Sequence, residues 1–158
     1  MVTTRASSAR RVSTPTPVAS SALVRAKMQA QSSSNTKPEI LLRRELHRRG
    51  VRFRLDQTLP THRRRRADIV WRRRKLAVFV DGCFWHGCPL HFVLPKTNSA
   101  WWADKIEANR VRDQATSSDL ATLGWTVVRV WEHSDPYASA DAIKGLLDQP
   151  PGGIVRLE

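Results

Sequence analysis

Both cysteines of this 158-residue chain lie in residues 81–91, together with two of its five histidines. The segment reads DGCFWHGCPLH and also contains an adjacent Phe-Trp pair. Thiols and imidazoles at short spacing are ligands for soft metal ions at neutral pH, and aromatic rings can stack on nucleic-acid bases. This mixture predicts a metal-stabilised loop that contacts DNA.

Zinc is the predicted metal of this loop. Cys83, Cys88 and His91 are spaced so that one loop can present them to a single tetrahedral ion, which needs a fourth ligand from elsewhere. We prefer His133, which follows a predicted strand, over His86, which is then free for proton transfer. Two other interpretations stay open, namely a disulfide between the cysteines and buried free thiols beside a core histidine. A zinc site favours a reducing compartment.

A group of carboxylates predicts a second metal site of harder character. Asp68 lies inside one apolar segment and Asp81 follows the next, so a hairpin would bring both to the same end, with Glu39 available from a preceding helix. Oxygen ligands suit Mg²⁺, which polarises a phosphodiester and stabilises its leaving oxygen. The alternative is a structural role in which Asp68 pairs with a neighbouring arginine.

Four aromatic residues near the cysteines indicate contact with bases: Phe84, Trp85, Trp101 and Trp102. Rings inserted between base pairs unstack them, and mispaired bases open most easily, so the set favours damaged or mismatched DNA. Taken alone, such rings are more often part of a hydrophobic core.

The net charge of the chain also indicates a polyanionic partner. The formal charge is +13, from 27 Lys and Arg against 14 Asp and Glu. Basic runs lie at 63–66 and 72–75, and we predict that the first run contacts DNA through Arg63, Arg64, Arg65 and Arg66. A solvated basic surface is the alternative. No apolar run approaches the ~20 residues of a spanning helix, so no membrane partner is expected.

Hydrophobic periodicity predicts the elements that must position these residues. The expected helices, with apolar positions three and four residues apart, cover residues 36–50, 99–123 and 139–148. The expected strands, which are short and rich in β-branched residues, cover 51–55, 67–71, 76–80 and 125–131. A capping box at Thr36 and Glu39 opens the first helix, and the second helix places Trp102 and Asp113 on one face. The pattern predicts an α/β fold, a mixed sheet flanked by helices.

The composition divides the chain into three parts. Residues 1–35 form a basic arm rich in Ser, Thr and Pro that should be disordered in isolation, 36–150 a single folded domain, and 151–158 a C-terminal tail. The arm also has the composition of an organellar transit peptide, which remains an alternative to a bacterial cytoplasmic, nucleoid-associated protein.

The residues of the central loop and its flanks resemble one known family. DGCFWHGC after an apolar strand, with ADIV before it and NxxxD and GWxVxxVWEH after it, resembles the very short patch repair (Vsr) endonucleases over residues 24–134. The resemblance implies a nuclease fold of the PD-(D/E)xK (restriction-endonuclease-like) type, a structural zinc ion and Mg²⁺ at the active site. The implied reaction is nicking of DNA 5′ to the thymine of a T:G mismatch left by deamination of 5-methylcytosine.

The resemblance also implies roles for individual residues. Asp68 corresponds to a metal-binding aspartate, His86 to the histidine that activates water, and Asp113 and Glu39 to acidic residues near the active site. Three residues correspond to intercalating aromatics, namely Phe84, Trp85 and Trp102. Lys27 and Met28 correspond to an arm that closes on the DNA.

The chain departs from the best-known members at two places. Val80 and Asp81 stand where those members have Thr-His, so the Val80 carbonyl and Asp81 are the expected additional Mg²⁺ ligands. His133 stands where they have a cysteine, and the spacing from Cys88 to His91 also differs, but two cysteines and two histidines still suit zinc.

Two rival functions stay open. One is a non-catalytic zinc module that grips distorted DNA, and the other is a sequence-specific restriction or defence nuclease of the same fold. The resemblance implies a monomer. Its candidate partners, besides double-stranded DNA with a T:G mismatch, are mismatch-repair proteins and a cytosine-5 methyltransferase system.

Overall fold

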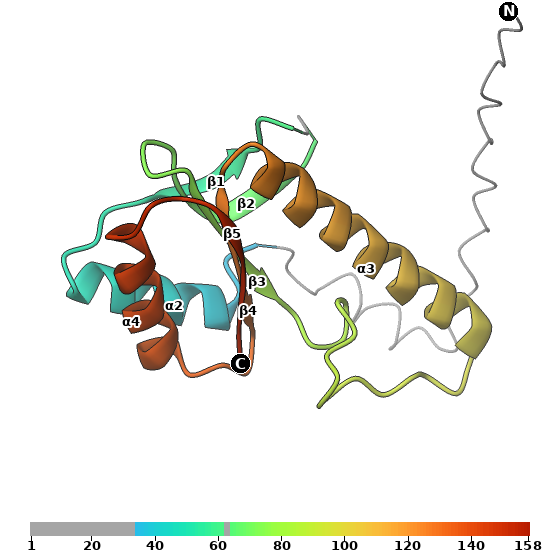
Figure 1. Ribbon diagram of the computed structural model, residues 1–158. Coiled ribbons are helices and arrows are strands. Elements are labelled where there is room, and N and C mark those ends of the chain that lie inside the picture. Colours follow the sequence, from blue (N-terminus) through green and yellow to red (C-terminus); the bar gives the residue numbers. More distant parts are fainter. Residues whose placement is uncertain (1–33, 62–63) are drawn as a thin grey trace, which may run out of the picture.

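The computed structural model describes residues 34–61 and 64–158, where three helices flank one five-stranded sheet (Figure 1). The helices are α2 (Lys37–Arg48), α3 (Ser99–Thr122) and α4 (Pro136–Leu147). The strands are β1 (Arg54–Thr58), β2 (Arg66–Trp71), β3 (Leu76–Asp81), β4 (Thr126–Trp131) and β5 (Gly153–Leu157). Their order is β1-β2-β3-β4-β5, with antiparallel pairing from β1 to β3 and parallel pairing from β3 to β5. The predicted mixed α/β fold is therefore confirmed.

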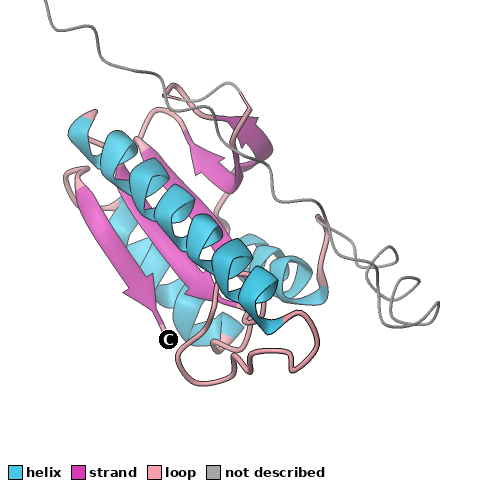
Figure 2. Ribbon diagram, turned by 90° about the vertical axis from the view of Figure 1, so that its right-hand side faces the viewer, coloured by secondary structure: helices cyan, strands magenta, loops and turns pink. Residues whose placement is uncertain are grey.

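Alternate residues of the central strands bury opposite faces of the sheet. On β4, Val128 packs in a core with residues of α2 and α4, whereas Val127 packs in a second core with Leu120 of α3. Figure 2 shows α3 across one face and the other helices behind the sheet. Because both faces of β4 are covered, its six residues are all buried, as is typical of a strand in the parallel part of a sheet.

The parallel pairing of β3 and β4 decides where the functional segments meet. Asp81 at the end of β3 lies beside Trp131 at the end of β4, and the connection between these strands contains the cysteine loop and α3. Parallel strands need such a long crossover, and their carboxyl ends share one edge of the sheet. Residues that follow β3 and β4 are thereby brought together although they are 50 positions apart.

Three local features differ from the expectations. Strand β1 begins at Arg54 rather than Val51, because the amide of Val51 donates to Leu46 O (3.0 Å) at the end of α2 and Phe53 stacks on His47. Thr36 is the N-cap of α2, but its side chain caps no backbone amide and donates to Glu39 instead, so the predicted capping box does not form. Residues 153–157, inside the predicted tail, form β5 on the sheet edge.

Candidate active site and metal cluster

Two thiols and two imidazoles meet at the shared edge of β3 and β4. The Cys83 Sγ atom lies 3.1 Å from His133 Nδ1 and 3.7 Å from His91 Nδ1, and Cys88 Sγ lies 3.6 Å from His91 Nδ1. Four ligand atoms, one from each residue, lie within 4.8 Å of one another. Ligands around a tetrahedral zinc ion are separated by about 3.5 Å, so this Cys2His2 cluster has the size and chemistry of a metal site.

The surroundings of Cys83 show why the cluster suits a cation. Both cysteines are buried and free, and the amide of Cys83 donates to a carboxylate oxygen of Glu132 (2.6 Å). Burial, together with Cys88 and Glu132, raises the pKa of the Cys83 thiol to about 12. A bound metal ion would offset this effect, since metal-coordinated thiols are deprotonated. Of the two alternatives for the fourth ligand, the structure places His133 in the cluster and His86 outside it.

A cavity of about 370 Å³ lies beside the cluster. It is lined by residues of α2, β2, β3, β4, α3 and the cysteine loop, among them Glu39, Asp68, Val80, Asp81, His86, Asp113 and Arg129. Basic residues also line it: Arg64, Arg65, Arg66 and Arg112. We call this cavity the carboxylate pocket.

Asp68 enters the carboxylate pocket from the middle of β2. Its Oδ2 atom accepts a hydrogen bond from the Val80 amide (2.7 Å) on β3. Burial raises the pKa of Asp68 to about 6, and the nearby charges of Glu39 and Asp81 act in the same direction, against the Val80 hydrogen bond. A carboxylate with a raised pKa gains most from a bound cation.

His86 and Asp113 form a close pair on another wall of the pocket. The His86 Nδ1 atom lies 2.5 Å from Asp113 Oδ2, and both side chains are partly exposed. Burial alone would raise the pKa of Asp113, but the His86 hydrogen bond and the Arg129 charge outweigh it and lower the pKa. A proton on Nδ1 donated to the ionised carboxylate leaves Nε2 as an acceptor, which is the arrangement of an oriented general base.

Asp81 is not free in the pocket, because Arg129 of β4 binds both of its oxygens. Arg129 Nε lies 2.7 Å from Asp81 Oδ2, and Nη2 lies 2.5 Å from Oδ1. Both side chains are buried, and Arg156 of β5 adds a contact at 3.3 Å. The bidentate geometry is that of a strong, oriented ion pair.

Glu39 lines the pocket from the first turn of α2 and is only 3% exposed. It pairs with Arg43 (2.6 Å) and accepts hydrogen bonds from the Asn35 amide (3.0 Å) and the Thr36 hydroxyl (2.9 Å). The hydroxyl therefore donates to Glu39 instead of capping a backbone amide, which explains why the capping box does not form.

The aromatic residues gather into one cluster between the cysteine loop and the start of α3. Phe84 is at its centre, with ring centroids 5.3 Å from Trp85, 5.1 Å from Trp102 and 5.7 Å from Phe92. Trp101 joins through Trp102 at 4.8 Å. All five rings are half-buried, in contrast to Trp125 and Trp131 of the sheet, which are buried.

Close packing holds this aromatic cluster against α3. Gly87 has φ +61°, and an added Cβ would lie 2.7 Å from the Arg110 guanidinium and 2.8 Å from Ile106. Asn109 donates a hydrogen bond to the Trp85 carbonyl (2.9 Å). Only glycine combines this backbone conformation with such an approach, so Gly87 permits the loop to lie on the helix.

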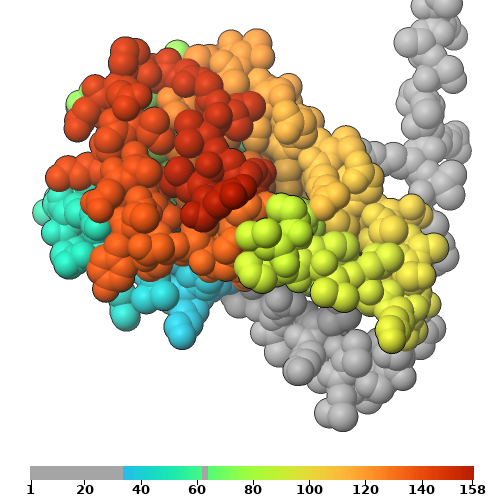
Figure 3. Space-filling model, turned by 60° about the horizontal axis from the view of Figure 1, so that its bottom comes forward, coloured from blue at the N-terminus to red at the C-terminus, as the bar shows by residue number. Residues whose placement is uncertain are grey.

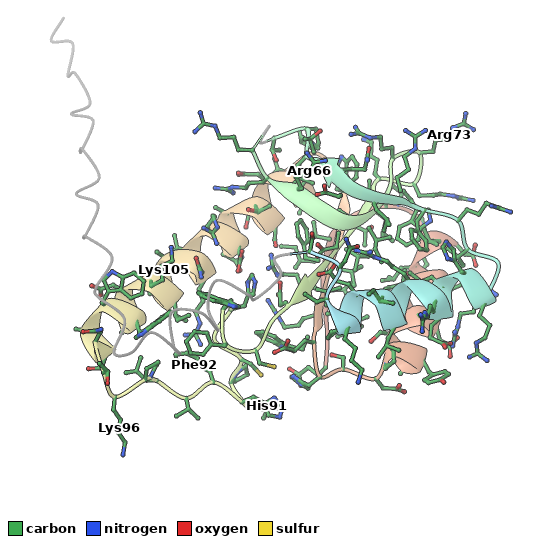
Figure 4. All side chains as sticks on the ribbon, turned by 180° about the vertical axis from the view of Figure 1, so that it is seen from behind. Arg66, Arg73, His91, Phe92, Lys96 and Lys105 are labelled. Carbon is green, nitrogen blue, oxygen red and sulfur yellow. The ribbon has the colours of Figure 1, made fainter. Side chains whose placement is uncertain are left out.

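The loop beyond the cysteines projects apolar side chains into solvent. Leu90 is 70% and Val93 78% exposed, and Figure 3 shows the loop as a lobe beside the first turns of α3. In Figure 4, His91, Phe92 and Lys96 lie on this lobe, whereas Arg73 of the basic turn lies on the opposite side of the molecule.

The predicted DNA-binding residues are only partly described. Arg65 donates to the Thr116 hydroxyl (2.5 Å) on α3, and Arg66 pairs with Asp56. Arg64 is exposed at the pocket wall. Lys27, Met28 and Arg63 lie outside the described residues.

Two arginines that line the pocket, Arg129 and Arg112, were not predicted from the sequence. A signal for Arg129 was present, since a single arginine inside the apolar run 125–131 must be paired once both faces of the strand are buried. Arg112 gave no such signal, because exposed helix positions tolerate arginine.

An open pocket of acidic, basic and histidine side chains on this mixed sheet, beside a cluster of aromatics, is the architecture of an endodeoxyribonuclease. The family description "DNA mismatch endonuclease Vsr" matches residues 18–91 of the chain. The chain belongs to the Vsr family.

Known relatives agree with this assignment. The chain is 43% identical to "Type II nicking enzyme V.NaeI" of Lentzea aerocolonigenes over 123 residues, which cover 77% of this chain and 72% of the relative. It is 45% identical to "Type II nicking enzyme V.XorIIP" of Xanthomonas oryzae pv. oryzae over 126 residues, covering 77% and 89%. It is 38% identical to "DNA mismatch endonuclease Vsr" of Escherichia coli over 108 residues, covering 66% of each.

The described helices include none with the length and apolar character needed to cross a bilayer.

Proposed function

We propose that this protein is a Mg²⁺-dependent endonuclease that nicks one DNA strand 5′ of the thymine in a T:G mismatch. The observation that carries the proposal is the carboxylate pocket, in which Asp68 and the His86–Asp113 pair face one cavity next to the aromatic cluster. The pocket joins the groups needed to hold a metal ion and to accept a proton from water, and the aromatics supply the means to open a mispaired step.

The donor set of the pocket fits Mg²⁺. Asp68 supplies a carboxylate whose charged form is unfavourable without a cation, and the Val80 carbonyl and Asp81 are further oxygens at the end of β3. We propose Asp68 and Val80 as ligands; Asp81, the third oxygen donor expected from the sequence, could join them only by giving up its contact with Arg129. When bound, Mg²⁺ would polarise the scissile phosphate.

His86 is the proposed general base. Asp113 holds the ring through Nδ1, so Nε2 is available to take a proton from the attacking water. The water oxygen would bond to phosphorus while the bond from phosphorus to the leaving sugar oxygen breaks. Glu39 lies deeper in the pocket, where its pairing with Arg43 suits a role in shaping the negative charge around the metal rather than in proton transfer.

DNA recognition is assigned to two surfaces. Phe84, Trp85 and Trp102 are proposed to insert at the mismatch, and Arg64, Arg65 and Arg66 to bind phosphates at the pocket wall. We assign Lys27, Met28 and Arg63 to the same DNA contact from the sequence alone.

We propose that zinc occupies the Cys2His2 cluster and has a structural role. The cluster contains four ligands from one protein chain, and structural zinc sites have this closed ligand set. Its position between the cysteine loop and the end of β4 would fix the loop that supplies His86 and Phe84.

The lesion that we propose suggests the setting of the enzyme. A T:G pair arises when the 5-methylcytosine of a C:G pair is deaminated, so we propose that a cytosine-5 methyltransferase in the bacterial cytoplasm generates the base from which the substrate forms. Action as a monomer and cooperation with mismatch-repair proteins remain predictions from the family resemblance.

A second function has support in the names of the relatives, several of which are type II nicking enzymes. In that case the surrounding sequence, rather than the mismatch, would select the site. The deciding experiment incubates the zinc-loaded protein and Mg²⁺ with T:G and fully paired duplexes in varied sequence contexts, beside an Asp68→Ala variant. A nick that requires both the mismatch and Asp68 supports the first function. A nick in paired DNA supports the second, and tight binding without turnover supports a non-catalytic module.

A further inference from the structure

A buried ion pair adjoins the proposed catalytic groups. Arg129 is 4% and Asp81 1% exposed, and the guanidinium of Arg129 donates hydrogen bonds to both carboxylate oxygens of Asp81. Phe79 lies under the guanidinium, 5.0 Å from ring centroid to Cζ. Burial of two charges requires full pairing, and a bidentate contact over an aromatic ring meets that requirement.

Arg129 also faces the second carboxylate of the pocket. Its Nη2 atom lies 3.4 Å from Asp113 Oδ2, the oxygen that contacts His86. The same guanidinium nitrogen therefore lies between Asp81 and Asp113. The order of contacts is Asp81, Arg129, Asp113 and His86, across β3, β4, α3 and the cysteine loop.

His86 has two carboxylates within reach. Its Nδ1 atom is 2.5 Å from Asp113 Oδ2 and 3.6 Å from Asp81 Oδ1. A free Asp81 would compete for the imidazole, and it would also offer oxygen ligands to a cation beside Asp68. Both Asp81 oxygens already accept from Arg129, and Oδ2 has a further contact from Arg156 of β5.

We propose that Arg129 is a positioning residue that holds Asp81 away from His86 and the metal and fixes Asp113 as the partner of His86. The inference rests on the proposed nuclease function and deepens it, because it assigns Asp81 as the anchor of Arg129 rather than as a metal ligand. Neither residue touches the substrate in this role. Removing Arg129 releases a buried carboxylate beside the base, whereas removing both residues eliminates the competitor as well.

The test compares three variants, Arg129→Leu, Asp81→Leu and the double variant, by single-turnover nicking of the duplex that wild type cleaves. The Mg²⁺ concentration is varied, and DNA affinity is measured separately. We expect Arg129→Leu to lower the maximal rate constant about 10- to 100-fold, the range for lost supporting contacts, with DNA affinity unchanged. The double variant should nick faster than Arg129→Leu, and its Mg²⁺ dependence should return to that of wild type.

Two further variants exclude a merely structural effect. Arg129→Lys keeps the charge but lacks the planar fork, so its rate should lie between those of wild type and Arg129→Leu, and it serves if the leucine variant does not fold. Arg49→Leu removes an arginine that pairs with Glu45 and Asp141 on α2 and α4. It should lower the melting temperature without changing the rate constant.

Two outcomes would overturn the proposal. If Asp81→Leu alone raises the Mg²⁺ concentration for half-maximal rate tenfold, Asp81 is a metal ligand. If the double variant is no faster than Arg129→Leu, Asp81 is not a competitor. Either result requires that wild type nicks the duplex, so it differs from failure of the proposed function, in which wild type itself is inactive.

Discussion

The Cys2His2 cluster and the carboxylate pocket lie at the same ends of strands β3 and β4 yet differ in their side-chain chemistry and in how open they are. β3 supplies Val80 and Asp81 to the pocket, and Cys83, two residues beyond the end of this strand, belongs to the cluster. The cluster contains soft ligands that face one another, whereas the pocket contains carboxylates, arginines and a histidine around an open volume of about 370 Å³. A closed ligand set stabilises a fold, and an open one leaves space for a substrate.

The largest expected effect is a loss of protein stability when the Cys2His2 cluster is disrupted, which tests whether the cluster has a structural role. Cys88→Ser should remove zinc and destabilise the protein strongly, because metal-binding energy in small structural sites is on the order of 10 kcal/mol. Metal content by mass spectrometry and thermal melting measure this, with Thr97→Ser on the exposed loop as the control. A protein that loses the metal yet melts like wild type contradicts the assignment.

The next effect concerns the pocket and should leave the cluster intact. His86→Ala should reduce the nicking rate at least about 10²-fold, the usual contribution of a general base, with zinc content and DNA affinity preserved. Asp113→Asn, which keeps the shape of the partner, should give a smaller loss. An unchanged rate in His86→Ala would assign the proton transfer to another group.

The pH dependence of stability tests a further difference between the two sites, because the ionised Asp68 carboxylate in the pocket destabilises the fold. The pKa of Asp68 is about 6 in the fold and has an ordinary value of 3.8, so the folded state binds this proton more tightly. The resulting stabilisation, up to ~3 kcal/mol, is complete below pH 3.8 and is lost as pH rises through about 6. In Mg²⁺-free buffer, Asp68→Asn should therefore unfold at higher denaturant concentration than wild type at pH 7.

That stabilisation of Asp68→Asn should shrink when the pH is lowered to 4, and Mg²⁺ should stabilise wild type but not the variant. Equal stability of the two proteins at both pH values would show that the Asp68 site is not strained by charge.

The smallest expected effect separates the positive wall of the pocket from the distant basic turn. Arg64→Ala should weaken DNA binding uniformly across sequences and reduce the slope of log K against log[salt] by about one. Arg73→Ala, on the side away from the loop lobe (Figure 4), is the matched control and should leave the slope unchanged. Equal losses in both variants would mean that DNA also covers the β2–β3 turn.

Most of the Cys2His2 cluster could be predicted from local sequence. Cys83, Cys88 and His91 lie within nine residues, so any compact loop brings them near each other, and soft ligands have few other reasons to cluster. Helix α3 was equally readable, because a 3.6-residue period places Trp102 and Asp113 on one face whatever packs against it. The fifth strand was not, since an edge strand of five residues beside Gly152 and Gly153 has a weak local signal.

By itself the sequence determined which side chains could hold a metal ion, the positive charge, the main helices and strands and the family to which the chain belongs. Only the tertiary structure decided that His133 rather than His86 joins the thiols, and that Asp81 is paired with Arg129. The physical reason is that both choices depend on the parallel pairing of β3 with β4, which joins residues 48 to 50 positions apart. Local spacing and propensity contain no information on such contacts. Because both faces of the sheet are buried, the charged side chain of Arg129 can pair only with a residue that the strand register brings within reach, which here is Asp81.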